Sequence, residues 1–256
     1  MTVLPFLTLL LAQAAAGPTL DQDRLTVCQA QARTDPATAI ATAAAWLTEA
    51  SGEQRSYPNE CLGLAYVSLL RWQAAEEAFM AAHDTRPETD HEGRARLAAM
   101  AGNAALPAGQ AQAASEHFEL AQRDAASASD TLLQGQIAAD RARALVAQGK
   151  LDDAAQALAD ARREAPQQVE SWLLSATLAR RQGKLDDPQF DIQTAAALDP
   201  KDPAVGLEAG LIAALAGRDD AARASWNSVI ETAPNAPEAT AARDYLAQLD
   251  KQPAAK

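Results

Sequence analysis

The chain has 256 residues, of which 48% are hydrophobic, 22% are charged and 4% are aromatic, a composition typical of a globular protein rather than a disordered one. It is rich in alanine, the residue with the highest intrinsic helix propensity, so we expect an all-helical protein. Because 34 acidic residues oppose 22 lysines and arginines, the net charge is −12 without a basic block, which argues against binding to nucleic acid or to anionic lipid headgroups.

The first 17 residues carry no charged side chain and contain an apolar run, Val3 to Leu11, that is too short to span a bilayer. Small residues follow in an A-x-A pattern that suits cleavage after Ala16. The segment has no lysine or arginine at its start, but a buried first helix fits less well, because the run has no polar face. We therefore predict a signal peptide at 1–16, a periplasmic or secreted protein, and no integral membrane span.

Turn residues divide the rest of the chain into helices that follow one another in pairs. Pro36 begins a helix, and Asp187 can cap a helix that begins at Pro188. We also expect Asp152 to cap the helix that runs to Arg163. The predicted helices are 20–33, 37–49, 57–70, 73–85, 92–106, 110–125, 129–148, 152–163, 168–182, 188–198, 203–216, 219–232 and 238–249, with no strand.

The pairs repeat along the chain with a period of 34 residues. The six residues QGKLDD occur at 148–153 and, letter for letter, at 182–187, and a weaker copy, AGRDDA, lies at 216–221. The earlier units are longer, and DAASASD at 124–130 and ETDHEG at 88–93 supply extra residues, which we expect to form loops at one edge. Self-similarity at this period indicates a solenoid, in which each unit buries its apolar face against its neighbours.

Residue types recur at fixed places in each unit: a large residue, a small one and an aromatic on the first helix, then alanine, an aromatic, alanine and proline in the second half. In the clearest unit these are Leu62, Gly63, Tyr66, Ala75, Phe79, Ala82 and Pro87. The pattern resembles the tetratricopeptide repeat over about residues 60–235, in five successive units. The resemblance implies an all-α, right-handed solenoid of helix-turn-helix repeats with a C-terminal capping helix.

Two residues depart from the family pattern. Leu70 stands where a turn glycine is usual, and Pro188 stands where the second helix usually has a small contact residue. We expect a looser turn at Leu70 and a helix that begins late after Pro188.

The resemblance also implies a concave groove, lined by the first helix of each pair, that holds an extended peptide or a partner helix. Its amides, cations and carboxylates can hydrogen-bond a peptide backbone and select for charge, although a solvated polar face is an equally good interpretation. The lysine and asparagine set with which some relatives hold a carboxylate is absent, because Asn103 lacks lysine neighbours. The repeat register predicts nine inward-facing side chains: Arg96, Asn103, Gln136, Asp140, Arg143, Glu170, Thr177, Arg180 and Arg181.

Cys28 and Cys61 are the only cysteines, and their separation of 33 residues is close to the repeat period. Stacking of the repeats therefore places them on neighbouring helices, where a disulfide needs Cα atoms within roughly 7 Å of each other. We expect a disulfide in an exported chain, and two small buried hydrophobic residues are the alternative.

The sequence has no local motif for nucleophilic catalysis, phosphate binding or a zinc site. G-x-S-x-G, the P-loop, H-E-x-x-H and G-x-G-x-x-G are all missing. His83, His91 and His117 lack the i, i+4 spacing of a helical zinc site, so we expect surface histidines, no metal and no cofactor.

These observations favour a non-enzymatic periplasmic adaptor that binds a protein or peptide of unknown identity through the concave groove. The alternative is a constitutive structural subunit of a cell-envelope assembly complex, which would use the convex face or an edge. An enzyme whose site is assembled from several helices is the third hypothesis. The predicted divisions are a signal peptide (1–16), a degenerate N-terminal helix pair (17–58), an array of about five repeats (59–235), and a capping helix with a tail (236–256).

Overall fold

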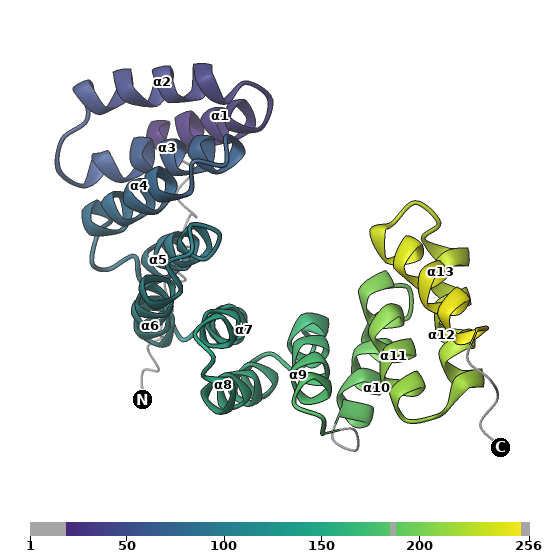
Figure 1. Ribbon diagram of the computed structural model, residues 1–256. Coiled ribbons are helices and arrows are strands. Elements are labelled where there is room, and N and C mark those ends of the chain that lie inside the picture. The colour runs from purple at the N-terminus through teal and green to yellow at the C-terminus, as the bar shows by residue number, and fades with distance from the viewer. Residues whose placement is uncertain (1–18, 185–187, 252–256) are drawn as a thin grey trace, which may run out of the picture.

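The computed structural model describes residues 19–184 and 188–251, so the predicted signal peptide and the predicted cap at Asp187 lie outside the described residues. The described residues form thirteen α-helices and one short 3₁₀ helix, and they contain no strand. Successive helices pack in pairs and stack into an arch with two arms (Figure 1). The prediction of an all-α solenoid of helix pairs is confirmed.

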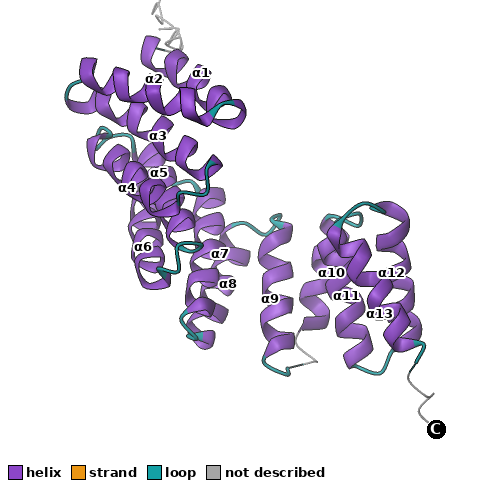
Figure 2. Cartoon of the chain, turned by 45° about the horizontal axis from the view of Figure 1, so that its top comes forward, coloured by secondary structure: helices purple, strands orange, loops and turns teal. Residues whose placement is uncertain are grey.

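The helices begin and end within three residues of their predicted limits. One arm of the arch holds α1 (Leu20–Thr34), α2 (Pro36–Glu49), η1 (Gly52–Arg55), α3 (Ser56–Ser68), α4 (Trp72–Thr85), α5 (His91–Ala105) and α6 (Ala111–Ala128). The base of the arch holds α7 (Thr131–Ala147), α8 (Leu151–Glu164) and α9 (Val169–Arg181). The other arm holds α10 (Pro188–Leu198), α11 (Pro203–Leu215), α12 (Asp219–Thr232) and α13 (Pro237–Leu249) (Figure 2).

The tight turns inside the helix pairs between α3 and α12 share one backbone geometry. At each of them an N–H group donates to the carbonyl oxygen five positions earlier, as Lys150 does to Leu145 at 2.9 Å, so the end of the first helix is capped. The residue just before the donor is left-handed, a conformation that glycine adopts without a steric cost. These residues are Gly109, Gly149, Gly183 and Gly217, with φ between 69 and 78°.

Leu70 occupies the same place in its turn as these glycines. Its φ is 57°, and the next residue, Arg71, donates to the carbonyl oxygen of Tyr66 at 2.9 Å. The expectation of a looser turn is therefore wrong. The turn is as tight as the others, and the leucine carries the steric cost of a left-handed backbone.

Aspartates cap several helices, but Asp152 is not one of them. α8 begins at Leu151 after Lys150, so Asp152 lies within the first turn. There its negative charge stabilises the helix, because the N-terminal end of the helix dipole is positive. α10 begins at Pro188 itself, because proline suits the first helical position, and the expectation of a late start is wrong. The aspartates whose side chains do accept first-turn N–H groups are Asp35, Asp90, Asp130 and Asp202.

The extra residues of the earlier units lengthen helices as well as loops. α6 is the longest helix with 18 residues, and it runs to Ala128 before Ser129 turns the chain with φ 57°. Most of the segment 124–130 is thus helical, and the expectation of a loop there is wrong, because its alanines continue the helix. In the segment 88–93, α5 already begins at His91.

One contact between the two helices of a pair recurs along the array. In each case the two contacting residues together fill a space of similar volume. Where the second helix carries an aromatic ring, the first has glycine, and an added Cβ would lie 2.1–2.7 Å from that ring. These pairs are Gly63 with Phe79, Gly102 with Phe118, and Gly210 with Trp226. Where the second helix carries an aliphatic residue, the first has alanine, as in Ala142 with Leu158 and Ala176 with Ile192. A methyl group and a branched side chain together fill the space of a hydrogen and a ring.

A disulfide joins the first helix pair to the repeat array. Cys28 on α1 and Cys61 on α3 are bonded, with Cα atoms 5.9 Å apart. Both side chains are buried in one cluster with Ala32, Ala39 and Ala65. The stacking register thus brings the helices close enough for the predicted bond.

Candidate functional site

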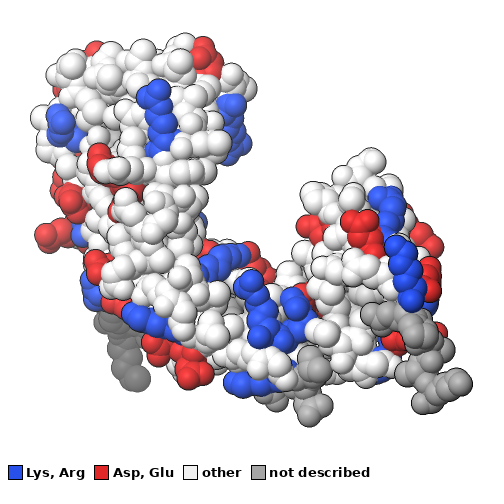
Figure 3. Space-filling view, viewed as in Figure 1, with Lys and Arg blue, Asp and Glu red and all other residues white. Residues whose placement is uncertain are grey.

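The space-filling view shows a hollow between the two arms of the arch (Figure 3), and the first helices of the repeats border it. α5, α7, α9 and α11 contact one another in series, so one side of the solenoid is a continuous layer of these helices. Lysine and arginine side chains gather at the base of the hollow, although the protein as a whole is acidic (Figure 3). The base is where α7 and α9 lie (Figure 1).

A ladder of polar side chains crosses this layer from α5 to α9. Asn103 Nδ2 on α5 donates to Asp140 Oδ2 on α7 at 3.0 Å. Arg143, one turn further along α7, forms ion pairs with Asp140 and with Glu170 on α9. We call these four residues the inner ladder. They place an amide, a guanidinium and two carboxylates along three successive repeats, at hydrogen-bonding distance from one another.

Burial perturbs one member of the inner ladder. Loss of hydration raises the pKa of the Asp140 carboxyl above its ordinary value of 3.8, while the Asn103 amide and the Arg143 guanidinium act in the opposite direction. The side chain is 21% exposed. Asp140 is thus a partly desolvated acceptor that holds Arg143 in position.

Arg180 was predicted to line the groove, but it forms an ion pair with the next repeat. Its Nε and one terminal nitrogen donate to the two carboxylate oxygens of Glu208 on α11, at 2.5 and 3.1 Å. Glu208 is buried, and a buried carboxylate needs such a partner. Because these donors are occupied, Arg180 joins two repeats and offers little to a ligand.

The other predicted groove residues are spread along the layer. Arg96 is exposed and pairs with Glu92 on its own helix. Gln136 is exposed on α7, one turn before Asp140 and therefore on the same face. Thr177 and Arg181 lie on α9 and face Arg143 across a cavity. The structure thus gathers most of the predicted groove residues between α5 and α9 and leaves Arg96 apart.

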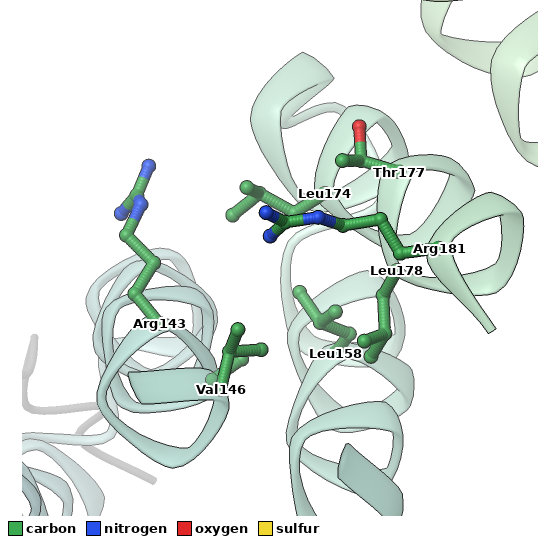
Figure 4. A pocket seen from close by; sticks show the side chains of 8 residues that line it. Arg143, Val146, Leu158, Leu174, Thr177, Leu178 and Arg181 are labelled. Atoms are coloured by element: carbon green, nitrogen blue, oxygen red, sulfur yellow. The ribbon is translucent and has the colours of Figure 1, made fainter. Parts of the chain in front are cut away.

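A cavity of about 160 Å³ opens between α7, α8 and α9 (Figure 4). Arg143, Thr177 and Arg181 were predicted from the repeat register, whereas the apolar residues were not, because the cavity depends on the angle between two repeats. The sequence carries one signal for it, because these aliphatic side chains follow the inward positions at helical spacing. That signal alone does not specify a cavity. The lining residues are Ala142, Arg143, Val146, Leu158, Leu174, Thr177, Leu178 and Arg181.

Two histidines are paired with carboxylates between α4 and α6, so the expectation of surface histidines is wrong for them. His83 is 2% exposed, and its ring nitrogens lie 3.0 Å from Asp84 and from Asp124. His117 Nε2 lies 2.9 Å from Glu76. No three histidine, cysteine or acidic side chains among residues 19–184 and 188–251 are placed to hold a metal ion.

The paired helices, the glycine–aromatic contacts and the continuous inner layer define the class of protein as a helical repeat solenoid. No family model and no curated protein matches the sequence. Solved structures do match: PilW, a widely conserved type IV pilus biogenesis factor, with a TM-score of 0.68 at 15% identity over 88% of this chain and 99% of that one. PilF of Pseudomonas aeruginosa matches with a TM-score of 0.67 at 13% identity over 89% and 97%. YrrB, a TPR protein with an unusual peptide-binding site, matches with a TM-score of 0.51 at 18% identity over 73% and 91%.

The chain therefore has the tetratricopeptide-repeat fold, as the sequence pattern predicted. At these identities the likeness concerns the fold alone. Within the part of the chain that the structure describes, no helix has both the length and the apolar character needed to cross a bilayer.

Proposed function

We propose that this protein is a non-enzymatic adaptor that binds a protein or peptide along the first helices of its repeats, at the base of the hollow. The observation that carries the proposal is the juxtaposition of the inner ladder with an open apolar cavity on α7 and α9. Polar groups that hydrogen-bond a backbone, next to a pocket that accepts a side chain, are what an extended peptide requires. YrrB, a protein of the same fold, has a peptide-binding site.

We place the adaptor outside the cytoplasm. The buried bond between Cys28 and Cys61 supports this proposal, because disulfides persist in oxidising compartments. The apolar segment at the start of the sequence supports it as well.

Site-specific photo-crosslinking tests the binding surface. A photoreactive amino acid replaces Gln136, which is exposed on α7 beside the inner ladder, or Gln156, which is exposed on α8, the second helix of the same pair. Both sites are glutamines on neighbouring helices, so expression and folding are matched. In periplasmic extract we expect a discrete crosslinked band from position 136 and none from position 156.

Charge reversal in the hollow gives the second arm of the test. Arg143→Glu combined with Arg181→Glu is expected to abolish the crosslink from position 136, because both guanidinium groups border the cavity. Arg163→Glu, an exposed arginine on α8, is the matched control and is expected to leave it unchanged. Equal crosslinking from positions 136 and 156, or no effect of the double reversal, would contradict binding at the base of the hollow.

A constitutive structural subunit of a cell-envelope assembly is the second candidate. Its support is the likeness to PilW, a pilus biogenesis factor, over 99% of that chain, together with the exposed side chains of Leu20 and Val27 on the outer helix α1. Light scattering on the purified protein separates the two candidates. A transient adaptor is expected to be monomeric, whereas a subunit with an unfilled apolar face is expected to self-associate.

A further inference from the structure

Two cavities in the layer of first helices occupy equivalent places two repeats apart. The cavity between α7, α8 and α9 measures about 160 Å³, and a second cavity, of about 180 Å³, opens between α11, α12 and α13. Their lining residues correspond at a separation of 68 residues, which is twice the 34-residue period. Among the corresponding pairs are Val146 with Ala214, Leu158 with Trp226, and Thr177 with Tyr245.

Hydrogen bonds cross the two steps of the layer that alternate with these cavities. One repeat position is held, on four successive first helices, by Asp140, Leu174, Glu208 and Ala242. Asp140 accepts from Asn103 across the step from α5 to α7, at 3.0 Å. Glu208 accepts from Arg180 across the step from α9 to α11, at 2.5 Å. The cavities open at the other two steps, where this position holds Leu174 or Ala242 in place of a carboxylate.

Each cavity has room for one large apolar side chain. Engineered apolar cavities of about 150 Å³ bind a single benzene ring, so a leucine or phenylalanine side chain fits either space. Leu158 lies at the floor of the first cavity, which Arg143 and Arg181 border (Figure 4). In the second cavity, Leu211 takes the place of Arg143. Leu249 takes the place of Arg181, so the rim of the second cavity is apolar as well.

The charges of the layer beside the cavities balance one another. The predicted groove residues on α7 and α9, together with Glu208, carry three guanidinium groups and three carboxylates. The ion pairs of Arg143 and Arg180 join these groups within the layer. This stretch is therefore neutral in a chain whose net charge is −12, and an uncharged segment matches it better than a charged one.

We propose that the two cavities together bind one uncharged, extended segment of a partner protein, with a large apolar side chain in each. The inference rests on the proposed function and specifies the sequence pattern of the ligand. Neighbouring helix axes lie about 8–10 Å apart, so two steps of the layer separate the cavities by roughly 20 Å. An extended chain advances about 3.3 Å per residue and directs every second side chain to the same side, so the two apolar residues are about six positions apart.

Synthetic peptides of glycine and serine that carry two leucines test the spacing. Both ends of each peptide are blocked, so that no terminal charge contributes. Methyl NMR signals of Val146 and Leu174 report on the first cavity, and the indole signal of Trp226 reports on the second. A peptide with one leucine is expected to bind with a Kd on the order of millimolar, as so small an anchor should.

Two leucines six positions apart are expected to shift both sets of signals in one titration. They should bind at least about tenfold more tightly than one leucine does, because the second anchor then binds intramolecularly. A spacing of five directs the second leucine to the opposite side of the peptide and is expected to remove this gain.

Filling one cavity at a time tests whether both are used. Val146→Phe and Ala214→Phe each add a ring at a half-buried position that lines one cavity. Each variant is expected to bind the two-leucine peptide about tenfold more weakly, as the wild type binds the one-leucine peptide. The signals of the other cavity should still shift, which shows that the layer is folded. Ala44→Phe adds the same ring at an exposed position of α2 and is expected to bind as the wild type does.

The possible outcomes separate this inference from the proposed function. Equal binding of the peptides with one and with two leucines at every spacing, or signal shifts in one cavity alone, overturns the two-anchor assignment. If the crosslink from position 136 is still formed in either of those cases, binding in the hollow stands and only the pattern of the ligand is wrong. If that crosslink is also missing, the proposed function fails together with the inference.

Discussion

The N-terminal arm and the base of the arch use polar residues in opposite ways. In the arm, Glu60 on α3 pairs with Arg86 at 2.6 Å and accepts from Gln29 on α1 at 3.3 Å, and the carboxylate is almost enclosed. Desolvation raises the pKa of the Glu60 carboxyl, and the charge of Arg86 opposes that shift. At the base, Arg143 and Glu170 pair at the surface of a hollow, beside an open cavity.

The difference shows where such a solenoid can place function. Each repeat is stabilised mainly by its neighbours, so a terminal pair has a partner on one side only and needs additional links. The disulfide from Cys28 to Cys61 and the hydrogen bond from Gln29 on α1 to Glu60 on α3 supply them. The repeats at the base have neighbours on both sides, and they can leave polar groups and apolar surface open to a ligand.

The largest effect is expected from removal of the disulfide. Cys28→Ala with Cys61→Ala opens a loop that spans a separation of 33 residues, and the chain-entropy estimate gives a loss of roughly 3 to 4 kcal/mol. Hydrogen exchange is expected to show faster exchange in α1 and α2, while residues 131–251 exchange as in the wild type. Faster exchange throughout the chain would contradict the nearest-neighbour account.

A smaller effect is expected where the glycine–aromatic contact is overfilled. In Gly63→Ala the new methyl group would lie 2.4 Å from the Phe79 ring, and such overpacking typically costs about 1–3 kcal/mol. Adding Phe79→Leu creates the combination that Ala142 and Leu158 form in another repeat, so it is expected to recover part of the loss. Urea unfolding of the two single variants and the double variant measures the coupling, and strict additivity would show that volume is not shared.

Replacement of Leu70, which is left-handed in its turn, by glycine is expected to raise the free energy of unfolding by about 1 kcal/mol. Leu70→Gly removes the steric cost of a φ of 57°, and little packing is lost because the side chain is exposed. Gly149→Ala is the converse change at φ 74° and is expected to destabilise by a similar amount. Thermal unfolding checks both, and a stabilised Gly149→Ala would contradict the account.

The smallest effect concerns the pH dependence of the inner ladder. Because folded Asp140 keeps its proton to higher pH than the unfolded chain, its contribution to stability is largest in acid and falls as pH rises from about 3.8 through the raised pKa. Asp140→Asn removes this titration. As pH rises across that range, the free energy of unfolding of the variant minus that of the wild type is therefore expected to increase, because only the wild type loses this contribution. Urea titrations at several pH values measure this difference. A decrease would show that Asn103 and Arg143 outweigh desolvation.

Much of the fold was predictable because its turns and helix starts are specified by local sequence. Gly149 and Pro188 mark turns and helix starts by their own backbone chemistry, and the repeat spacing assigned Leu70 to a turn despite its side chain. The inner ladder was predictable from the repeat register, but its pairings were not. Arg180 faces the predicted side, yet it is occupied by Glu208 from the next repeat, which only the stacking geometry reveals.

The pairing of His83 shows the same limit. Its partner Asp124 lies 41 residues further along the chain, a separation that departs from the 34-residue period because the earlier units are longer. The histidine itself belongs to α4, and nothing in its local sequence distinguishes a buried position from an exposed one. Contacts between repeats depend on the rotation from one unit to the next, and that rotation is a property of packed side chains.

The most direct test of the separation between a stabilising arm and a binding base compares two backgrounds in one photo-crosslinking experiment. The photoreactive residue at position 136 is placed in the Cys28→Ala, Cys61→Ala protein and in the Arg143→Glu, Arg181→Glu protein. The account predicts an undiminished crosslink in the first, although its N-terminal helices are loosened, and none in the second, because the charge at the base of the hollow is reversed. Loss of the crosslink in the protein without the disulfide, with full crosslinking in the charge-reversed one, would contradict it.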